Sequence, residues 1–166
     1  ASGSVTLTLP FSAAAAARLP IAIDLDEVYI DAVGGTVTLA GNIAADEHIT
    51  EFLPVRVFVE ENYIVMATAN GVIKKTDLMS FSNIRSGGII AINLDGGDRL
   101  ISARLTDGKT DIFLGTHLGQ AIRFGEDDVR EMGRQTRGVK AIKLDEGDEV
   151  VSMETVEEGA TVLTVT

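Results

Sequence analysis

The sequence predicts an all-β, propeller-like fold, and three observations support this prediction. The stretch from Gly88 to Asp98 returns fifty residues later as the stretch from Gly138 to Asp148, and such self-similarity is typical of repeat architectures. Val, Ile and Thr occur in short runs separated by Gly and Asp, which is the pattern of strands and turns. Each repeat contains four such runs, the number of strands in a propeller blade.

The repeat continues beyond this core and gives the chain two to three units. Ile101-Ser102 aligns with Val151-Ser152 at the same offset, and a weaker third copy begins at Asp46. A chain of 166 residues is long enough to bury a core as a single domain. We expect one β domain over residues 1–166, with an atypical N-terminal unit at 1–60, blades at 61–110 and 111–159, and a strand of an incomplete or swapped blade at 160–166.

The N-terminal unit contains one alternating strand and one helical candidate. Residues 5–9 alternate Val, Thr and Leu, and residues 12–18 combine a serine with five alanines and an arginine. The alanine run fits either a helix or a single turn or irregular loop, and the second interpretation is favoured because an isolated helix of this length is unstable. A second alternating strand lies at residues 161–165. Exposed strand edges need partners, so the two terminal strands either pair with each other, closing the chain, or pair between molecules.

Each repeat opens with a predicted β-hairpin. In the first repeat residues 63–69 form a strand, Asn70-Gly71 forms the turn, and residues 72–75 form the returning strand. Asn-Gly between two apolar runs is the strongest short-range indication of a hairpin. In the second repeat the strand at 112–116 turns at Leu118-Gly119 and returns through residues 120–124.

Two further strands follow each hairpin. The third strand is expected at residues 89–94 and 139–144, and the fourth at 99–105 and 149–155, with an acidic turn between them. The polar stretch between hairpin and third strand is two residues longer in the second repeat. Insertions of this kind are tolerated in surface loops.

Composition excludes several classes of protein. The chain contains no cysteine, so it has neither disulfides nor thiolate metal sites, in keeping with a cytoplasmic location. No apolar run approaches the roughly 20 residues of a membrane span, and we expect no membrane partner.

Candidate catalytic residues are sparse. His48 and His117 lie in different units, and the chain has no Gly-x-Ser-x-Gly turn. The acidic clusters at 126–128 and 145–149 fit either a divalent cation site or solvated turns, and their spacing, which differs from a calcium loop, favours turns. We expect neither catalysis nor a metal or cofactor.

Basic residues are better organised. Between Arg130 and Lys143 the chain has five basic residues against the single acid Glu131, although its net charge is −11. Equivalent positions of repeated blades lie on the same rim, so basic residues of both repeats are expected to form an interrupted stripe that contacts phosphates. The alternative is ordinary surface charge. The candidate DNA-binding residues are Lys74, Lys75, Arg85, Arg123, Arg130, Arg134, Arg137, Lys140 and Lys143.

Several long motifs resemble one known family. Phe52-Leu53-Pro54-Val55, the stretch from Tyr63 to Thr76, the stretch from Arg85 to Leu94 and the stretch from Gly119 to Val139 are similar to the C-terminal domain of the bacterial DNA gyrase A subunit. The resemblance runs from about Ile49 to Thr166, whereas residues 1–48 follow the family poorly. It implies a β-pinwheel, a propeller variant whose blades exchange strands, which wraps DNA around a basic rim and leaves catalysis to other parts of the enzyme.

Two functions remain open on this basis. The first is a module that binds double-stranded DNA through phosphate contacts without reading bases. The second is a truncated, designed or recombined pinwheel scaffold that binds no DNA, which the net acidic charge favours. The unpaired edge strands additionally predict a homo-oligomer.

Overall fold

The structure is a computed structural model that describes residues 3–8, 36–41, 50–51, 53, 55, 57–83, 88–157, 159–161 and 163. Contacts divide the chain into two units, Ala1–Phe58 with Phe81–Ile89, and Val59–Ser80 with Ile90–Thr166. We call them unit 1 and unit 2 and describe each by itself. No helix in the described ranges has the length and apolar character needed to traverse a bilayer.

The described part of unit 1 contains a two-stranded antiparallel sheet. Strand β1 (Gly3–Thr8) pairs with β2 (Thr36–Gly41) from Gly3 opposite Gly41 to Thr8 opposite Thr36. The predicted N-terminal strand is therefore present, and its partner in this sheet is β2. The alanine-rich residues 12–18 lie outside the described residues, as do three of the five residues of the predicted strand at 161–165.

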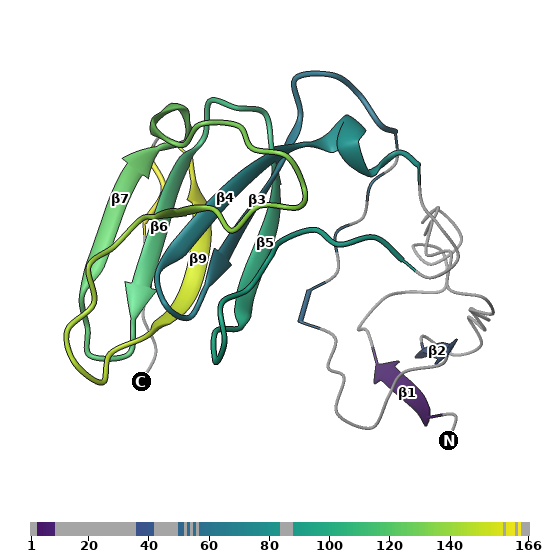
Figure 1. The fold of residues 1–166 in the computed structure, drawn as a ribbon, viewed down its shortest axis with the longest axis horizontal. Helices are drawn as coiled ribbons and strands as arrows, with labels where there is room; N and C mark the ends of the chain where they lie inside the picture. The colour runs from purple at the N-terminus through teal and green to yellow at the C-terminus, as the bar shows by residue number, and fades with distance from the viewer. Residues whose placement is uncertain are drawn as a thin grey trace. The chain divides into compact units, whose positions relative to one another are not determined.

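Unit 2 contains two antiparallel sheets (Figure 1). The first has the order β5-β3-β4-β8, and the second has the order β7-β6-β9. Their strands are β3 (Tyr63–Thr68), β4 (Val72–Asp77), β5 (Leu100–Thr106), β6 (Asp111–Thr116), β7 (Ala121–Gly125), β8 (Val139–Lys140) and β9 (Val150–Val156). Two single-turn 3₁₀ helices, η1 (Leu78–Phe81) and η2 (Glu126–Asp128), follow β4 and β7.

Both predicted hairpins are confirmed. Strand β3 pairs with β4 from Tyr63 opposite Asp77 to Ala67 opposite Ile73, and β6 pairs with β7 from Asp111 opposite Gly125 to Gly115 opposite Ala121. The fourth strands are also present, because β5 pairs with β3 and β9 pairs with β6. Alternation of apolar residues and the turn residues were sufficient to locate these six strands.

The third strand of each repeat differs from the prediction. The prediction for residues 89–94 is wrong, because residues 88–94 form no strand in the described structure. Of the strand predicted at residues 139–144, only Val139 and Lys140 form one. They pair with Ile73 and Val72 of the first repeat. The first sheet therefore takes its fourth strand from the following repeat. This exchange joins the two repeats. The first blade therefore consists of three strands of its own repeat and one strand of the next.

Glycine makes the exchanged strand possible. Gly138 has a φ of +102°, and a Cβ there would lie 2.5 Å from the carbonyl oxygen of Ile73. Gly71, in the turn of the first hairpin, accepts a 2.8 Å hydrogen bond from the Ala141 N–H group. A Cβ on Gly71 would lie 2.9 Å from Cγ2 of Ile142. A side chain at position 138 would push β8 away from β4, and one at position 71 would displace Ile142.

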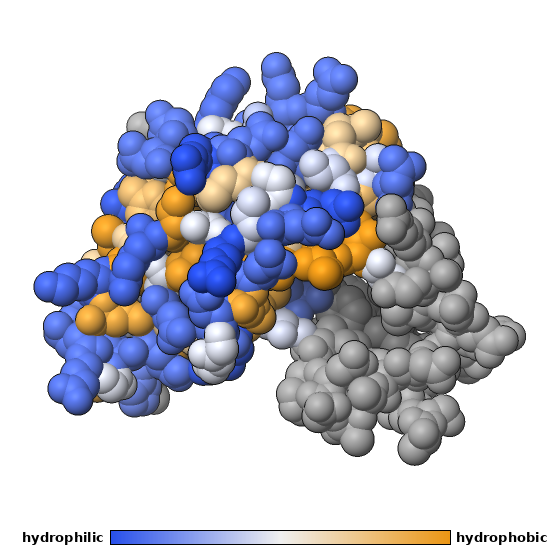
Figure 2. Space-filling view, in the orientation of Figure 1, coloured by the Kyte–Doolittle hydropathy of each residue, from blue (hydrophilic) through white to orange (hydrophobic). Residues whose placement is uncertain are grey.

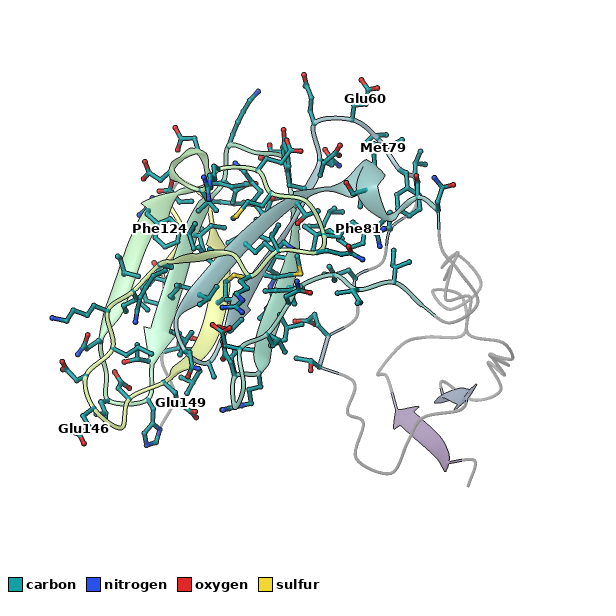
Figure 3. All side chains as sticks on the ribbon, viewed as in Figure 1. Glu60, Met79, Phe81, Phe124, Glu146 and Glu149 are labelled. Carbon is teal, nitrogen blue, oxygen red and sulfur yellow. The ribbon has the colours of Figure 1, made fainter. Side chains whose placement is uncertain are left out.

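The core of unit 2 is built from both sheets, from Val129 after η2 and from the segment that follows β8. Its buried members are Val65, Ala67, Ile73, Ile112, Leu114, Val129, Ile142, Val150 and Met153. Ile122, Phe124 and Leu144 pack against this cluster from its edge. Hydrophilic side chains cover much of the visible face of unit 2, with hydrophobic residues between them (Figure 2). Glu146 and Glu149 lie at one end of the unit, and Glu60 and Met79 lie at the other (Figure 3).

Candidate nucleic-acid interface

The predicted DNA-binding residues fall into two groups that differ in exposure. Lys74 and Lys75 of β4 are buried, with 0% and 7% of their surface exposed. Arg123, Arg130, Arg137, Lys140 and Lys143 are exposed, Arg134 is partly buried, and Arg85 lies outside the described residues. This difference could not be predicted from the sequence, because the charge of a lysine is the same in either setting.

Lys74 is surrounded by backbone carbonyl groups. Its Nζ donates hydrogen bonds to the carbonyl oxygens of Ala91 at 2.7 Å and Thr136 at 3.1 Å, and also to that of Arg134. Burial, together with the positive charge of Arg134, lowers the pKa of Lys74 to about 8. The ammonium group of Lys74 is thus occupied by carbonyl oxygens. It holds residues 134–136 against β4.

Lys75 has a similar structural role. Its Nζ donates a 2.9 Å hydrogen bond to the carbonyl oxygen of Glu126 and lies 5.1 Å from the centre of the Tyr63 ring. The backbone of Lys75 accepts a 2.8 Å hydrogen bond from the Met132 N–H group. Lys74 and Lys75 therefore fix both ends of the loop that follows η2, and are removed from the candidate phosphate contacts.

The loop fixed in this way leads into the exposed basic residues. We call residues 130–143 the basic segment, which comprises nearly all of this loop, β8 and the three residues after it. Asn93 fastens its middle, because the Asn93 N–H group donates to Thr136 O and the side-chain amide donates to Gln135 O, both at 3.0 Å. Hydrogen bonds to the carbonyl groups of residues 134–136 thus hold the backbone in the middle of the basic segment.

Ion pairs neutralise only part of the exposed positive charge. Arg137 pairs with Asp95 at 2.9 Å, and Arg123 of β7 pairs with Asp111 at 2.7 Å. The remaining basic side chains of the segment form no ion pair with any residue in the described part of the chain; these are Arg130, Arg134, Lys140 and Lys143. The basic segment therefore offers four cationic groups without an ion-pair partner among the described residues, and three of them are exposed.

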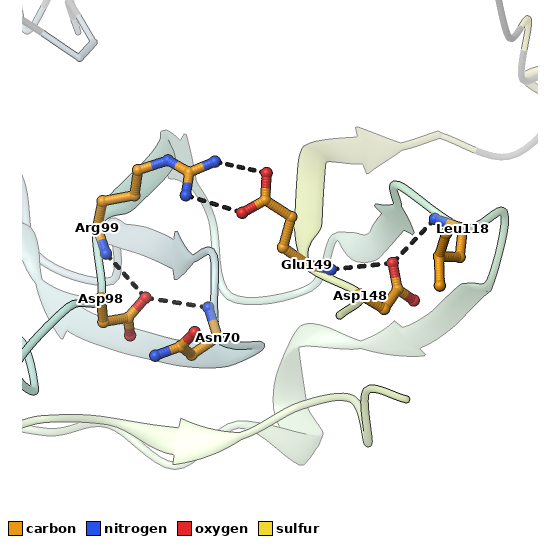
Figure 4. A network of polar contacts seen from close by, with 6 residues as sticks. All are labelled: Asn70, Asp98, Arg99, Leu118, Asp148 and Glu149. Carbon is orange, nitrogen blue, oxygen red and sulfur yellow. Dashed lines mark hydrogen bonds and ion pairs between the residues drawn. The ribbon is translucent and has the colours of Figure 1, made fainter. Parts of the chain in front are cut away.

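A second polar network, which the sequence reasoning missed, links equivalent positions of the two repeats (Figure 4). Asp98 Oδ1 accepts hydrogen bonds from the N–H groups of Asn70 and Arg99, and Asp148 Oδ1 accepts from those of Leu118 and Glu149. Each aspartate thereby fastens the hairpin turn of its own repeat. The sequence did contain an indication, because Asp98 and Asp148 occupy the same position in the repeat.

Ion pairs join the two repeats across this network. Arg99 makes two hydrogen bonds to the Glu149 carboxylate, at 2.7 and 2.8 Å, and Arg104 lies 3.2 Å from Glu154. The pairs connect positions that are equivalent in the repeat and carry opposite charge. The hydrogen bond and the charge of Arg99 lower the pKa of Glu149. These arginines are engaged in joining β5 to β9 and are not part of the candidate interface.

No metal site is formed by the residues that the structure describes, since these contain no cluster of three His, Asp or Glu side chains. His48 lies outside them, and His117 is exposed. The predicted solvated turn at 126–128 is wrong for Glu126, which is fully buried and accepts a 2.6 Å hydrogen bond from the Thr106 hydroxyl group. Asp127 and Asp128 are exposed as expected.

Comparison with known proteins places these features in a family. The sequence profile described as DNA gyrase C-terminal domain, beta-propeller, matches residues 62–107 and 110–157, which are the two repeats. The chain is 52% identical over 109 residues to the DNA gyrase A protein of Haloquadratum walsbyi, and 48% identical over 124 residues to that of Salmonella typhimurium. These matches cover 64% and 75% of the chain but only 13% and 14% of the relatives' lengths.

Solved structures agree with the sequence comparison. A crystal structure of the C-terminal domain of DNA topoisomerase IV aligns with a TM-score of 0.67 and 36% identity, covering 70% of this chain and 36% of the other. A structure of a DNA gyrase A C-terminal domain aligns with a TM-score of 0.62 and 29% identity, covering 70% and 39%. With two matching repeats, an all-β fold and the exchange of β8, the chain belongs to the family of DNA gyrase C-terminal domains of the β-propeller type.

Proposed function

We propose that this chain is a DNA-binding module that contacts the phosphates of double-stranded DNA without reading the bases. The observation that carries the proposal is the basic segment, with four cationic side chains unpaired among the described residues in a chain of net charge −11. Membership of the gyrase C-terminal domain family supports it. Side chains that contact phosphates fix the position of a protein on a duplex and carry no sequence information directly.

The proposed division of labour differs from the nine equal contacts expected from sequence. The positive charge comes from the four unpaired side chains Arg130, Arg134, Lys140 and Lys143. Lys74 and Lys75 of β4 hold the basic segment in place through hydrogen bonds. Arg123 and Arg137 contribute after exchanging their carboxylate partners for phosphates. Arg85 remains a proposed contact on sequence grounds alone. No catalysis is proposed for this chain.

A scaffold that binds no DNA is the alternative. It is favoured by the excess of 25 acidic over 14 basic residues, because long-range repulsion opposes the approach of an anionic duplex. It is also favoured by the ion pairs of Arg123 and Arg137, which compete with phosphate binding.

A salt titration separates the two functions. Fluorescence anisotropy of a labelled duplex of about 40 base pairs is measured with the protein at several salt concentrations. We expect binding at low salt that weakens steeply, with log K falling by about 0.9 per phosphate contact for each unit of log salt concentration. No change in anisotropy at low salt and micromolar protein would leave the scaffold as the function.

Matched variants test which charges are used. Lys140→Gln removes an exposed charge from the basic segment, and Lys109→Gln removes one from the exposed turn between β5 and β6. We expect Lys140→Gln to lower the magnitude of the salt slope by about 0.9 and Lys109→Gln to leave it unchanged. Equal effects of the two variants would mean that the basic segment is not the interface.

A further inference from the structure

Strand exchange is completed at only one of the two hairpins. At the first hairpin, β8 pairs with the outer edge of β4, Ala141 N–H donates to Gly71 O, and Ile142 packs over Gly71. At the second hairpin, β7 occupies the position of β4, but β6 is its only hydrogen-bonded neighbour among the described residues. Figure 1 accordingly shows β7 at an outer edge of unit 2.

The open edge of β7 has the features of the occupied edge of β4. Gly119 has a φ of +87° and Gly71 a φ of +77°, yet a Cβ on Gly119 would meet nothing within 4 Å in the described structure. The Gln120 carbonyl oxygen accepts a 2.9 Å hydrogen bond from Thr116 N–H and thus points toward β6. Because successive residues of a strand alternate in direction, the N–H and C=O groups of Ala121 point to the open edge.

The chain also contains a segment of matching sequence that pairs with no strand among the described residues. Residues 88–94 repeat the sequence pattern of residues 138–144, the segment that contains β8. Gly88 has a φ of +74°, as Gly138 has one of +102°, but a Cβ there would meet nothing within 4 Å among the described residues. Leu94 is 44% exposed, whereas its counterpart Leu144 packs against the core.

Residues 88–94 are held beside the basic segment of the same molecule. The Ala91 carbonyl oxygen accepts from Lys74 of β4, and Asn93 N–H donates to Thr136. The Ala91 N–H group, whose counterpart in Ala141 donates to Gly71, makes no hydrogen bond to a described residue. The segment cannot pair with β7 of the same molecule without breaking its contacts with Lys74 and Thr136.

We propose that residues 88–94 of one molecule add to the β7 edge of a second copy of this chain, as β8 adds to β4. By the register of β8 on β4, Ile89 lies opposite Ala121 and Ile90 opposite Gln120. Ala91 N–H donates to Gly119 O, and Leu94 covers Gly119 next to Leu118, which is 60% exposed in the single chain. The contact is head-to-tail, so each molecule offers one donor segment and one acceptor edge, and assembly gives a ring where the rotation closes and an open filament where it does not.

Light scattering of the purified chain over a series of concentrations tests the assembly. The expected result is a mass that rises above that of one chain as concentration increases. A strict monomer at several hundred micromolar would overturn the proposal. This experiment contains no DNA, so its outcome is independent of the DNA-binding function.

Two variants block opposite sides of the contact. Gly88→Ala blocks the donor side, because residue 88 takes the place of Gly138, where an added Cβ would collide with the paired strand. Ala121→Pro blocks the acceptor side, because it removes the N–H group at the first residue of an edge strand, a position where proline is accepted. Each variant alone is expected to be monomeric. An equimolar mixture is expected to form dimers and nothing larger, because one intact donor and one intact acceptor remain.

The matched control is Gly96→Ala, at a glycine with nothing within 4 Å of the added Cβ and no positive φ. This variant should assemble like the parent chain. Assembly that survives both blocking variants, or a mixture that stays monomeric while far-ultraviolet circular dichroism shows both variants folded, would exclude this contact.

Discussion

Lys74 illustrates at the scale of one residue how burial changes the role of a charge. Its Nζ bonds to carbonyl oxygens of three residues, two of which belong to the loop preceding β8. An ammonium group has three donors, so the three carbonyl groups satisfy it fully. The sequence identified Lys74 as basic but could not show that its environment was carbonyl groups instead of solvent.

Replacing Lys74 by methionine should therefore destabilise the fold. The Lys74→Met variant keeps the volume of the side chain but leaves three carbonyl groups without their donor, which should lower the free energy of unfolding by about 2–4 kcal/mol. Urea unfolding followed by circular dichroism measures this loss. Lys109→Met, at an exposed position, is the control and should stay within about 0.5 kcal/mol of the parent. Equal stability of the two variants would contradict the structural role of Lys74.

The acidic residues of the polar network predict a loss of stability in acid. Burial acts to raise the pKa of Asp148, but hydrogen bonds from the Leu118 N–H group, the Thr116 side chain and the Glu149 N–H group act against it, and the net shift is downward. Arg99 lowers the pKa of Glu149. Both carboxyl groups thus bind protons less readily when folded than when unfolded, so the free energy of unfolding is greatest above pH of about 4 and falls as the pH drops below it.

Urea midpoints at pH 7, 5, 4 and 3 measure this dependence. Glu149→Gln removes one of the titrating groups and should show a smaller decline between pH 5 and pH 3 than the parent chain. A decline as steep as that of the parent would mean that Glu149 contributes nothing to the acid sensitivity.

At the scale of elements, local signals located the hairpins but not the exchanged strand. The Asn70-Gly71 turn and the alternation in β3 to β7 are properties of neighbouring residues. The pairing of Val139 with Ile73 joins positions 66 residues apart (139 − 73). The residue pattern at 139–144 indicates a strand, but alternation within one segment cannot specify which distant edge accepts it. The same pattern at 89–94 also indicates a strand, although the described structure gives it no partner.

Gly138 gives a direct test of the exchanged strand. Gly138→Ala should destabilise the fold by about 2 kcal/mol or more, because it combines a positive φ with a Cβ contact of 2.5 Å to the Ile73 carbonyl oxygen. Gly133→Ala, where an added Cβ meets nothing within 4 Å, is the control and should change stability little. Thermal unfolding of the two variants provides the comparison. A Gly138→Ala variant as stable as Gly133→Ala would show that β8 does not approach β4 this closely.

At the scale of the whole molecule, the repeat and the family could both be read from the sequence. The profile match covers residues 62–107 and 110–157, within the range over which the motifs resembled gyrase. The distribution of charge could not be read in the same way. Fourteen basic residues are visible in the sequence, but only three-dimensional contacts separate those that hold a loop, those that join β5 to β9 and those left exposed. The sequence therefore indicated where basic residues gather, but it could not show which of their charges are exposed.

The exchange of β8 has a consequence for the order in which the protein is made. The first sheet is complete only after Val139 has been synthesised, 62 residues after β4 ends at Asp77 (139 − 77). At about 5–20 residues per second, a nascent chain carries the unfilled β4 edge for roughly 3–12 seconds. During that interval residues 88–94, which have the same pattern as the missing strand, are already available. The ribosome thus releases residues 88–94 before it has made β8, the strand that pairs with this edge in the folded chain.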